Sequence, residues 1–302
     1  VMSTVDAALD KFGFDYLIIA SGIEKTQFLD DCHYPFKPNP QFKYWAPLTL
    51  NPNSFIVYKS GQKPIMIYFQ PDDYWHVPPS APHGDWVEHF DIRIINEPDD
   101  ALKHLPNPTR AAIIGEADAA LGTYIPNNPK SLLDYLNYHR AYKTPYELAQ
   151  MRKAQAKAVR GHQAAEQAFR AHGSEAQINA AFLAAAGHTD SDLPYNNIVA
   201  LNENGATLHY QYKSFNKPAH HRSLLIDAGA EHNGYAADIT RTYGNGFELY
   251  EQLIDAVDKE QHALCAQVKS GIDYRELHLH CHLRLAGVLS NLGIVDMEPG
   301  SM

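Results

Sequence analysis

The chain has 302 residues, a formal charge of −10 at neutral pH, and an ordinary composition of 45% hydrophobic and 20% charged residues. This length allows one or two buried cores, and the acidic balance argues against a nucleic-acid-binding surface, which requires clustered Lys and Arg. The chain has no apolar stretch of about 18 residues, no signal-peptide pattern and only irregularly spaced cysteines, so we expect a cytoplasmic protein without a membrane span or disulfide framework.

Residues 1–142 are expected to form an α/β domain. Helical stretches are expected at 5–12, near 100–105 and at 131–138. The prolines of segment 35–42 predict irregular structure there, because proline removes a backbone donor and restricts φ. Short apolar runs bounded by turn residues predict strands at 16–20, 54–58, 64–69, 91–95 and 110–115.

Residues 143–302 are expected to form a second domain, and its first helix has a well-marked start. Thr144-Pro145-Tyr146-Glu147 is a capping box with proline at the first helical position. That helix is expected to run to about residue 171, and Ser174 is expected to cap a second helix that ends near 186. The remaining predicted elements are strands at 196–201, 207–212 and 222–228, a hairpin partner strand, and helices near 248–268 and 273–292.

Two aspartates, Asp227 and Asp238, each end a short apolar run, and Asn233-Gly234 lies between the runs. This pattern predicts a β-hairpin that carries two buried carboxylates. Because ionised carboxylates are costly to bury and repel each other, a bound metal pair explains them economically. The alternative is that one aspartate caps a turn and the other pairs with Arg241.

Several further motifs are spread over essentially the whole chain. They are Phe28-Leu-Asp-Asp31, Tyr34-Pro-Phe-Lys37, Asn39-Pro-Gln-Phe42, Tyr74-Trp-His76, His139-Arg-Ala-Tyr-Lys143, Tyr146-Glu-Leu-Ala149 and Tyr235-Ala-Ala-Asp-Ile-Thr-Arg-Thr242. With these motifs the chain resembles the pita-bread metallopeptidases, a group that contains methionine aminopeptidase, aminopeptidase P and prolidase, and within that group the bacterial Xaa-Pro dipeptidases. The resemblance implies an α+β protein in which the α/β domain precedes an incomplete pita-bread catalytic domain.

The resemblance implies a dinuclear metal site and a hydrolytic mechanism. Asp227 matches a ligand of one ion, and Asp238 matches a ligand that bridges two divalent ions, for which hard oxygen donors favour Mn²⁺. A hydroxide bridging the two ions is expected to attack the scissile carbonyl of an Xaa-Pro dipeptide. His209 matches a residue that stabilises the oxyanion; without the resemblance it would be an ordinary core histidine.

Other residues take supporting roles through the same resemblance. Thr240, on the strand face of Asp238, is expected to hydrogen-bond a metal carboxylate. Tyr195 and Leu208 match positions that line the substrate pocket, although an aromatic after proline is more often a packing residue. Asp31 matches a residue that reaches into the partner subunit's pocket in a homodimer, with a solvated loop carboxylate as the alternative.

The chain departs from the family pattern at its C-terminal end. The family uses five metal ligands, and the histidine and two glutamates that follow the aspartates have no match before Met302. Glu298-Pro-Gly300 resembles one such strand only superficially. We therefore expect a fragment that is inactive by itself, derived from a dipeptidase whose N-terminal half excludes long peptides. The alternatives are an organophosphate-hydrolysing prolidase, an aminopeptidase P, and a non-catalytic pita-bread binding module.

Overall fold

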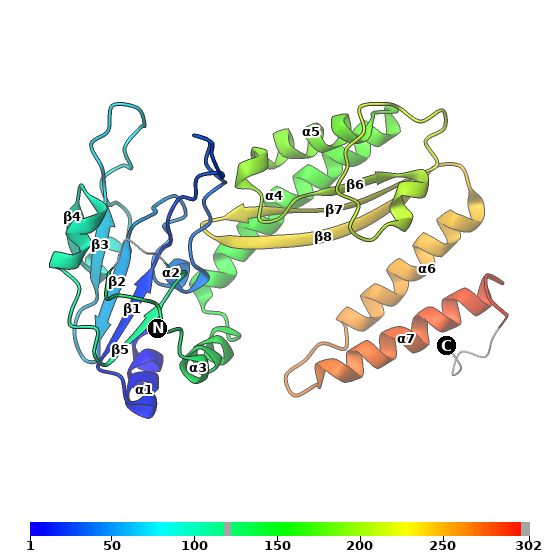
Figure 1. The fold of residues 1–302 in the computed structure, drawn as a ribbon. Coiled ribbons are helices and arrows are strands. Elements are labelled where there is room, and N and C mark those ends of the chain that lie inside the picture. The colour runs from blue at the N-terminus through cyan, green and yellow to red at the C-terminus, as the bar shows by residue number, and fades with distance from the viewer. Residues whose placement is uncertain (118–121, 297–302) are drawn as a thin grey trace. The chain divides into compact units, whose positions relative to one another are not determined.

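The computed structural model describes residues 1–117 and 122–296, and the chain in it divides into two compact units (Figure 1). The first unit contains Val1–Met151 and the short stretch His232–Tyr235. The second contains Arg152–Glu231 and the chain from Ala236 onward. Within the described residues, none of the helices is both long and apolar enough to cross a bilayer.

A five-stranded mixed sheet, in the order β4-β3-β2-β1-β5, forms the centre of the first unit. β1 pairs antiparallel with β2 and parallel with β5, while β3 pairs antiparallel with β2 and parallel with β4. The elements of this unit are α1 Met2–Phe12, β1 Tyr16–Ala20, α2 Pro40–Trp45, β2 Phe55–Lys59, β3 Ile65–Phe69, η1 Val87–His89, β4 Asp91–Ile95, η2 Pro98–Lys103, β5 Ala111–Ile114 and α3 Lys130–Arg140.

Both faces of this sheet are covered by a hydrophobic cluster, and successive apolar side chains of β1 point alternately into the two clusters. Leu17 and Ile19 belong to a core cluster with residues of α1, α2 and α3, whereas Ile18 belongs to a second cluster with residues of η2. The predicted strands agree with the observed ones to within one residue at each end. The near-continuous apolar runs are therefore explained by a sheet that has a hydrophobic cluster on each side.

The expectation of irregular structure at 35–42 is wrong at its end, because α2 begins at Pro40. The side chain of Asn39 caps this helix by accepting a hydrogen bond from the Gln41 amide at 2.9 Å. Proline at the first helical position loses nothing, since the amide there has no partner within the helix. The same local rule that predicts a helix at Pro145 therefore applies at Pro40.

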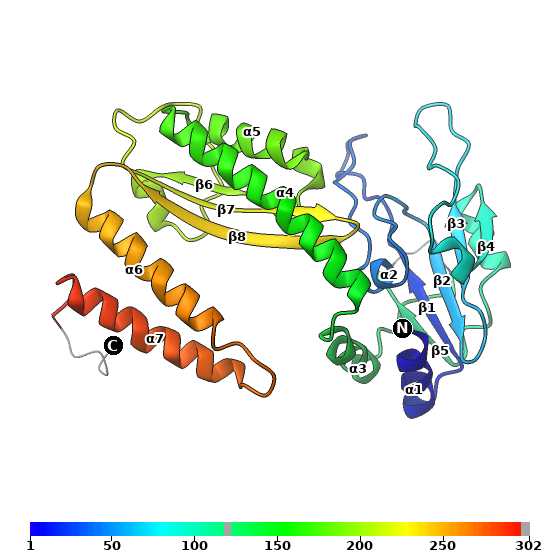
Figure 2. The same ribbon diagram turned by 180° about the vertical axis from the view of Figure 1, so that it is seen from behind.

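The second unit combines a three-stranded sheet, in the order β6-β7-β8, with helices. α4 and α5 lie over one face of the sheet (Figure 2), where Phe169 and Phe182 pack against Val199 and Ile226. The elements are α4 Pro145–Arg170, which begins in the first unit, α5 Glu175–Ala186, η4 Asp190–Asp192, β6 Ile198–Leu201, η5 Asn202–Ala206, β7 Ser223–His232, β8 Tyr235–Gly244, α6 Glu248–Cys265 and α7 Tyr274–Asn291.

Three local predictions in this part of the chain are confirmed. The Thr144 amide donates to Glu147 Oε2 at 2.7 Å and the Glu147 amide donates to Thr144 Oγ1 at 3.3 Å, which is the predicted capping box. Ser174 forms a second capping box at the start of α5. Asn233 and Gly234 connect β7 to β8 with φ values of 50° and 82°, as a two-residue hairpin turn requires.

The strand predicted at 207–212 does not form. After the short helix η5, the chain continues to β7 without regular structure, and Leu208 is 88% exposed. The Tyr210 hydroxyl and the Ser214 amide donate hydrogen bonds to the side chain of Glu175 on α5 instead of to a neighbouring strand, and Asn204 of η5 does the same. A side-chain acceptor that lies distant in sequence therefore replaces the predicted ladder.

Candidate metal centre

The two aspartates lie on neighbouring strands and converge on one atom. Asp227 is on β7, and Asp238 is on β8. The hydroxyl oxygen of Tyr195, just before β6, lies 2.9 Å from Asp227 Oδ1 and 2.8 Å from Asp238 Oδ1. The predicted carboxylate pair is therefore brought together by the hairpin, with a phenol hydroxyl between the two acids.

The close approach of Tyr195 depends on a glycine in β7. A Cβ placed on Gly229 would come within 2.7 Å of the Tyr195 ring and within 3.1 Å of the Pro194 ring. It would also overlap the backbone carbonyl of Ala237 on β8. Glycine is thus the residue that allows both the hairpin partner and the tyrosine ring to lie against this part of β7.

The prediction that both carboxylates are buried is wrong for Asp238. Asp227 is half-buried, whereas Asp238 is exposed. β8 is one of the two edge strands of the three-stranded sheet, and its alternate residues Ala236, Asp238 and Thr240 are all exposed. This shared exposure agrees with the expectation that Thr240 lies on the face of Asp238, because successive strand residues point to opposite sides.

The negative charge of the two aspartates is not compensated by a basic side chain in the described part of the chain. The guanidinium of Arg241 donates to the Thr240 carbonyl at 2.7 Å, and in the described part of the chain neither aspartate has an ion-pair partner. Burial, followed by the hydrogen bonds to Asp238 and Asp227, raises the pKa of the Tyr195 hydroxyl well above its usual range. The phenol therefore stays protonated, and because it is neutral it supplies no positive charge to offset the two carboxylates.

This arrangement fits a divalent ion by its donor chemistry. The two carboxylates place hard oxygen atoms at hydrogen-bond distance from the same Tyr195 hydroxyl and therefore close to each other, and hard divalent ions such as Mn²⁺ and Mg²⁺ prefer such donors. The alternative of a turn cap plus an Arg241 ion pair is not what the structure forms, since the turn lies at Asn233 and Gly234. The residues present are suited to hold a metal, with Asp227 and Asp238 as ligands.

His209 and Leu208 lie in the exposed segment between η5 and β7. Within residues 1–117 and 122–296, His209 makes no hydrogen bond to either aspartate. Their predicted roles at the site therefore stay predictions. Sequence reasoning missed Glu175, a buried acid that binds this segment, because a glutamate in the first turn of a helix is usually explained by the helix dipole.

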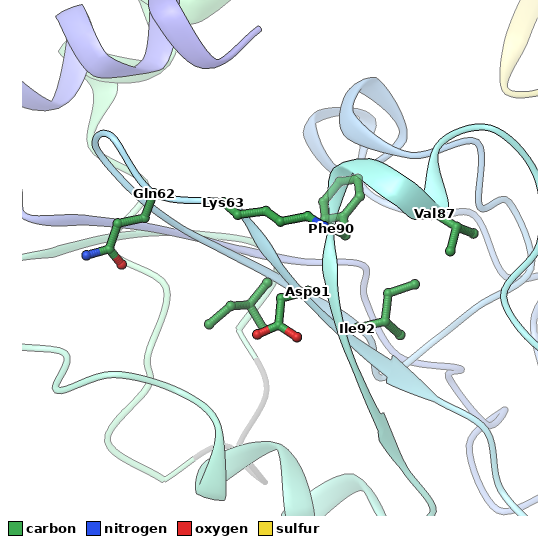
Figure 3. Close-up of a pocket in the computed structure, with 7 residues that line it drawn as sticks. Gln62, Lys63, Val87, Phe90, Asp91 and Ile92 are labelled. Atoms are coloured by element: carbon green, nitrogen blue, oxygen red, sulfur yellow. The ribbon is translucent and has the colours of Figure 1, made fainter.

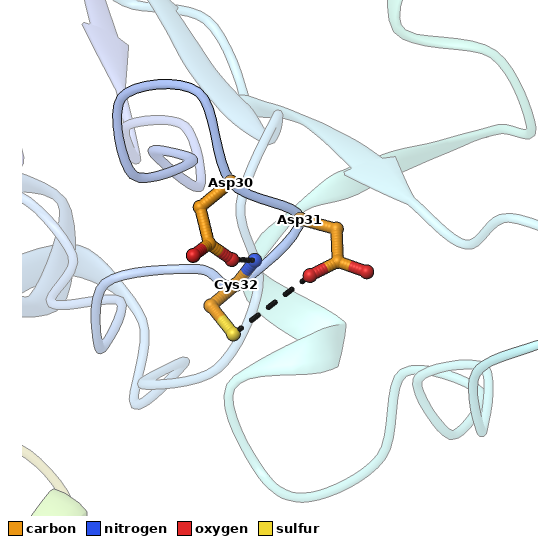
Figure 4. A group of neighbouring side chains, drawn as sticks. All are labelled: Asp30, Asp31 and Cys32. Carbon is orange, nitrogen blue, oxygen red and sulfur yellow. Dashed lines mark hydrogen bonds between the residues drawn. The ribbon is translucent and has the colours of Figure 1, made fainter.

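Asp31 lies in an exposed loop of the first unit beside Asp30 and Cys32 (Figure 4). The Asp30 carboxylate accepts a hydrogen bond from the Cys32 amide at 2.8 Å, and the Cys32 thiol lies 3.9 Å from Asp31 Oδ1. Potential ligand atoms of these three residues lie within 4.8 Å of one another. All three residues are exposed, as expected for a solvated loop, so proximity alone does not make this cluster a metal site.

A pocket in the first unit lies at the starts of β3 and β4 (Figure 3). Lys63, Phe90 and Asp91 are among its lining residues, and none of the predicted site residues is. It combines one ammonium and one carboxylate with apolar side chains and contains no converging pair of acids. The Asp227–Asp238 pair is therefore the better candidate for a catalytic centre.

Comparison with known proteins identifies the family. The Xaa-Pro dipeptidase N-terminal domain matches residues 1–138, and metallopeptidase family M24 matches residues 149–292. The Xaa-Pro dipeptidase of Xanthomonas campestris pv. campestris (strain B100) is 53% identical over 296 residues, which cover 97% of this chain and 67% of the relative. The chain belongs to the Xaa-Pro dipeptidase family.

A second relative agrees with membership of the Xaa-Pro dipeptidase family, and two solved structures agree with the fold. The Xaa-Pro dipeptidase of Stenotrophomonas maltophilia (strain K279a) is 51% identical over the same share of each chain. Escherichia coli aminopeptidase P with the inhibitor Pro-Leu matches with a TM-score of 0.74, at 20% identity, over 100% of this chain and 76% of that structure. Pseudomonas aeruginosa aminopeptidase PepP gives 0.72 at 19% identity, covering 99% and 74%. The fold is thus the expected one, an N-terminal domain followed by a pita-bread-like domain.

Proposed function

We propose that the protein hydrolyses the peptide bond that precedes proline in Xaa-Pro dipeptides, using two divalent ions held in part by Asp227 and Asp238. The convergence of these carboxylates on the Tyr195 hydroxyl carries the proposal, because that geometry concentrates negative charge at one point. The names of the relatives supply the substrate class. Mn²⁺ is the proposed ion, since all the offered donors are hard oxygens.

The chain's own residues would then divide the work. Bound divalent ions supply Lewis-acid activation of a water molecule for attack on the carbonyl carbon. Asp227 and Asp238 hold the ions, and Thr240 hydrogen-bonds one of these carboxylates. His209 donates its ring N–H to the oxygen that becomes negative, which lowers the transition state without binding the ground state more tightly. Tyr195 and Leu208 line the substrate pocket.

The proposal includes a homodimeric assembly and a cytoplasmic location. In a homodimer, Asp31 would enter the partner subunit's pocket, where an exposed loop carboxylate could bind the substrate's terminal amine. The N-terminal domain would exclude longer peptides. A cytoplasmic location suits the three free thiols, of which Cys32 and Cys265 are exposed and would be open to oxidation outside a reducing compartment.

The test combines a substrate comparison with a matched pair of variants. Full-length protein loaded with Mn²⁺ is expected to hydrolyse Gly-Pro and to leave longer Xaa-Pro peptides intact. Asp238→Asn is expected to lower kcat/KM by more than about 10²-fold, since loss of a ligand costs more than loss of its supporting partners. Asp258→Asn on the exposed face of α6 is the control, with unchanged kcat/KM and Mn²⁺ binding.

Each outcome decides between the alternatives. Cleavage of longer peptides in preference to Gly-Pro would indicate an aminopeptidase P. Hydrolysis of organophosphorus esters without dipeptide cleavage would indicate a different hydrolase. No hydrolysis by the metal-loaded protein, with Mn²⁺ binding equal in wild type and Asp238→Asn by calorimetry, would contradict both the activity and the site.

A further inference from the structure

Glu175 is a buried acid whose carboxylate is fully engaged by hydrogen-bond donors. It is the first residue of α5 and only 1% exposed. Its Oε1 accepts from the Leu201 amide at 3.0 Å and from Asn204 Nδ2 at 2.8 Å. Its Oε2 accepts from the Tyr210 hydroxyl at 2.9 Å and from the Ser214 amide at 2.9 Å. Two donors thus meet each oxygen.

These donors are spread along one segment, residues 201–214, which contains Leu208 and His209. Leu201 and Ser214 are the ends of the segment, and because both amides donate to the Glu175 carboxylate, this side chain holds the two ends together. The Ala176 amide adds a second tie by donating to the Ser214 carbonyl at 3.1 Å. The same carboxylate also accepts a hydrogen bond from the hydroxyl of Tyr210, which directly follows His209 in the middle of the segment.

Hydrogen bonding offsets the cost of burying this group. In the described part of the chain, no Lys or Arg forms an ion pair with Glu175. Four donors and the amino-terminal end of α5 take the place of a cation. Such an arrangement tolerates change poorly, because an amide in place of one carboxylate oxygen would direct N–H groups against two existing donors.

We propose that Glu175 is a positioning residue for the candidate active site: it holds the 201–214 segment in one conformation and thereby fixes the backbone that carries His209. The proposal rests on the proposed function as far as catalysis is concerned. In the part of the chain that the structure describes, no hydrogen bond joins Glu175 to the aspartate pair, so its effect would reach the reaction through the placement of the imidazole. Among the segment's donors, Tyr210 is the nearest in sequence to His209.

The first experiment measures the segment itself in this chain. Glu175→Gln keeps the size of the side chain and is expected to raise amide hydrogen exchange at either Leu201 or Ser214 by about 10-fold or more, because the glutamine NH2 group replaces the oxygen that one of these amides uses as its acceptor. Glu203→Gln is the matched control, since Glu203 lies in the same segment but is exposed and pairs with Arg222 at the surface. Exchange in the variant equal to wild type would overturn the proposal.

The second experiment measures catalysis by the full-length protein on Gly-Pro. Glu175→Gln is expected to lower kcat by about 10²-fold with KM within about twofold, as expected when a transition-state contact is misplaced by a fraction of an ångström to an ångström. Glu203→Gln keeps the wild-type kcat. A purely structural role would lower the melting temperature and leave kcat per folded molecule unchanged, which would overturn the positioning claim.

The two experiments separate the failure of this inference from failure of the proposed function. If the wild type does not cleave Gly-Pro, the proposed function is wrong. The exchange result alone then supports or overturns the claim that Glu175 holds the 201–214 segment in one conformation. If the wild type cleaves Gly-Pro and Glu175→Gln retains full kcat, only the positioning claim falls. Should Glu175→Gln fail to fold, Tyr210→Phe removes one donor from the same carboxylate, and unchanged exchange and kcat in that variant would overturn the inference.

Discussion

A glycine inside α4 allows a sharp test of how the helices pack against the catalytic-domain sheet. A Cβ placed on Gly161 would lie 2.6 Å from Cε2 and 2.7 Å from Cδ2 of the Phe182 ring on α5. Phe182 has 0% exposure and belongs to the cluster that covers β6 and β7. Its ring also meets His162 edge-on at 5.5 Å. The ring therefore cannot move away without disturbing the core.

Two opposed effects set the result of Gly161→Ala. Alanine is favoured over glycine in a helix interior by about 0.5–1 kcal/mol. An added methyl group in a well-packed core costs about 1–3 kcal/mol. The packing cost exceeds the propensity gain, so we expect a net loss of about 1–2 kcal/mol in the free energy of unfolding. Gly287→Ala in α7 is the matched control, because nothing lies within 4 Å of its Cβ position and only the gain remains.

Urea unfolding of the two variants and wild type measures both terms. The expected order of stability is Gly287→Ala, then wild type, then Gly161→Ala. The double variant Gly161→Ala with Phe182→Leu is expected to be more stable than the sum of the single changes by about 0.5 kcal/mol or more, because the smaller side chain relieves the contact. If Gly161→Ala were as stable as Gly287→Ala, the close packing of α4 on α5 would be refuted.

Three further predictions follow from individual contacts. Burial lowers the pKa of His162 and His188 below 6.5, so the unfolded chain binds protons first as the pH falls through that value. The free energy of unfolding, measured by urea titration, should therefore decrease from about pH 7 to about pH 5. His188→Gln should make this decrease shallower. A free energy of unfolding that does not change over this pH range would contradict the prediction. Ser174→Ala removes the capping box of α5 and should cost about 1 kcal/mol in thermal denaturation, whereas an unchanged melting temperature would mean that the cap contributes nothing. Tyr195→Phe removes the hydroxyl that the two aspartates share, and should destabilise the metal-free chain by about 1 kcal/mol. Mn²⁺ should still raise the melting temperature of this variant. Equal stability of the variant and the wild type without metal would show that the hydroxyl contributes nothing.

Features governed by neighbouring residues were predictable from the sequence. The capping boxes at Thr144 and Ser174 depend on residues three positions apart, and the hairpin turn depends on Asn233-Gly234. The strands of the first unit were predictable because their apolar runs are short and bounded by turn residues. The same reasoning placed both aspartates on one hairpin, which is enough to bring them close together.

Features that depend on distant partners were decided by the tertiary structure. Segment 207–212 has a strand-like sequence, but Tyr210 within it and Ser214 just after it donate hydrogen bonds to Glu175 on α5, which no local pattern reveals. Likewise, Tyr195 joins both aspartates only because Gly229 admits its ring. The sequence by itself determined where the capped helices α4 and α5 begin, where the β7–β8 turn lies and that the two aspartates share one hairpin, because these follow from backbone geometry over a few residues. The tertiary structure decided which polar groups satisfy one another, because a buried donor or acceptor takes whichever partner the fold brings within reach.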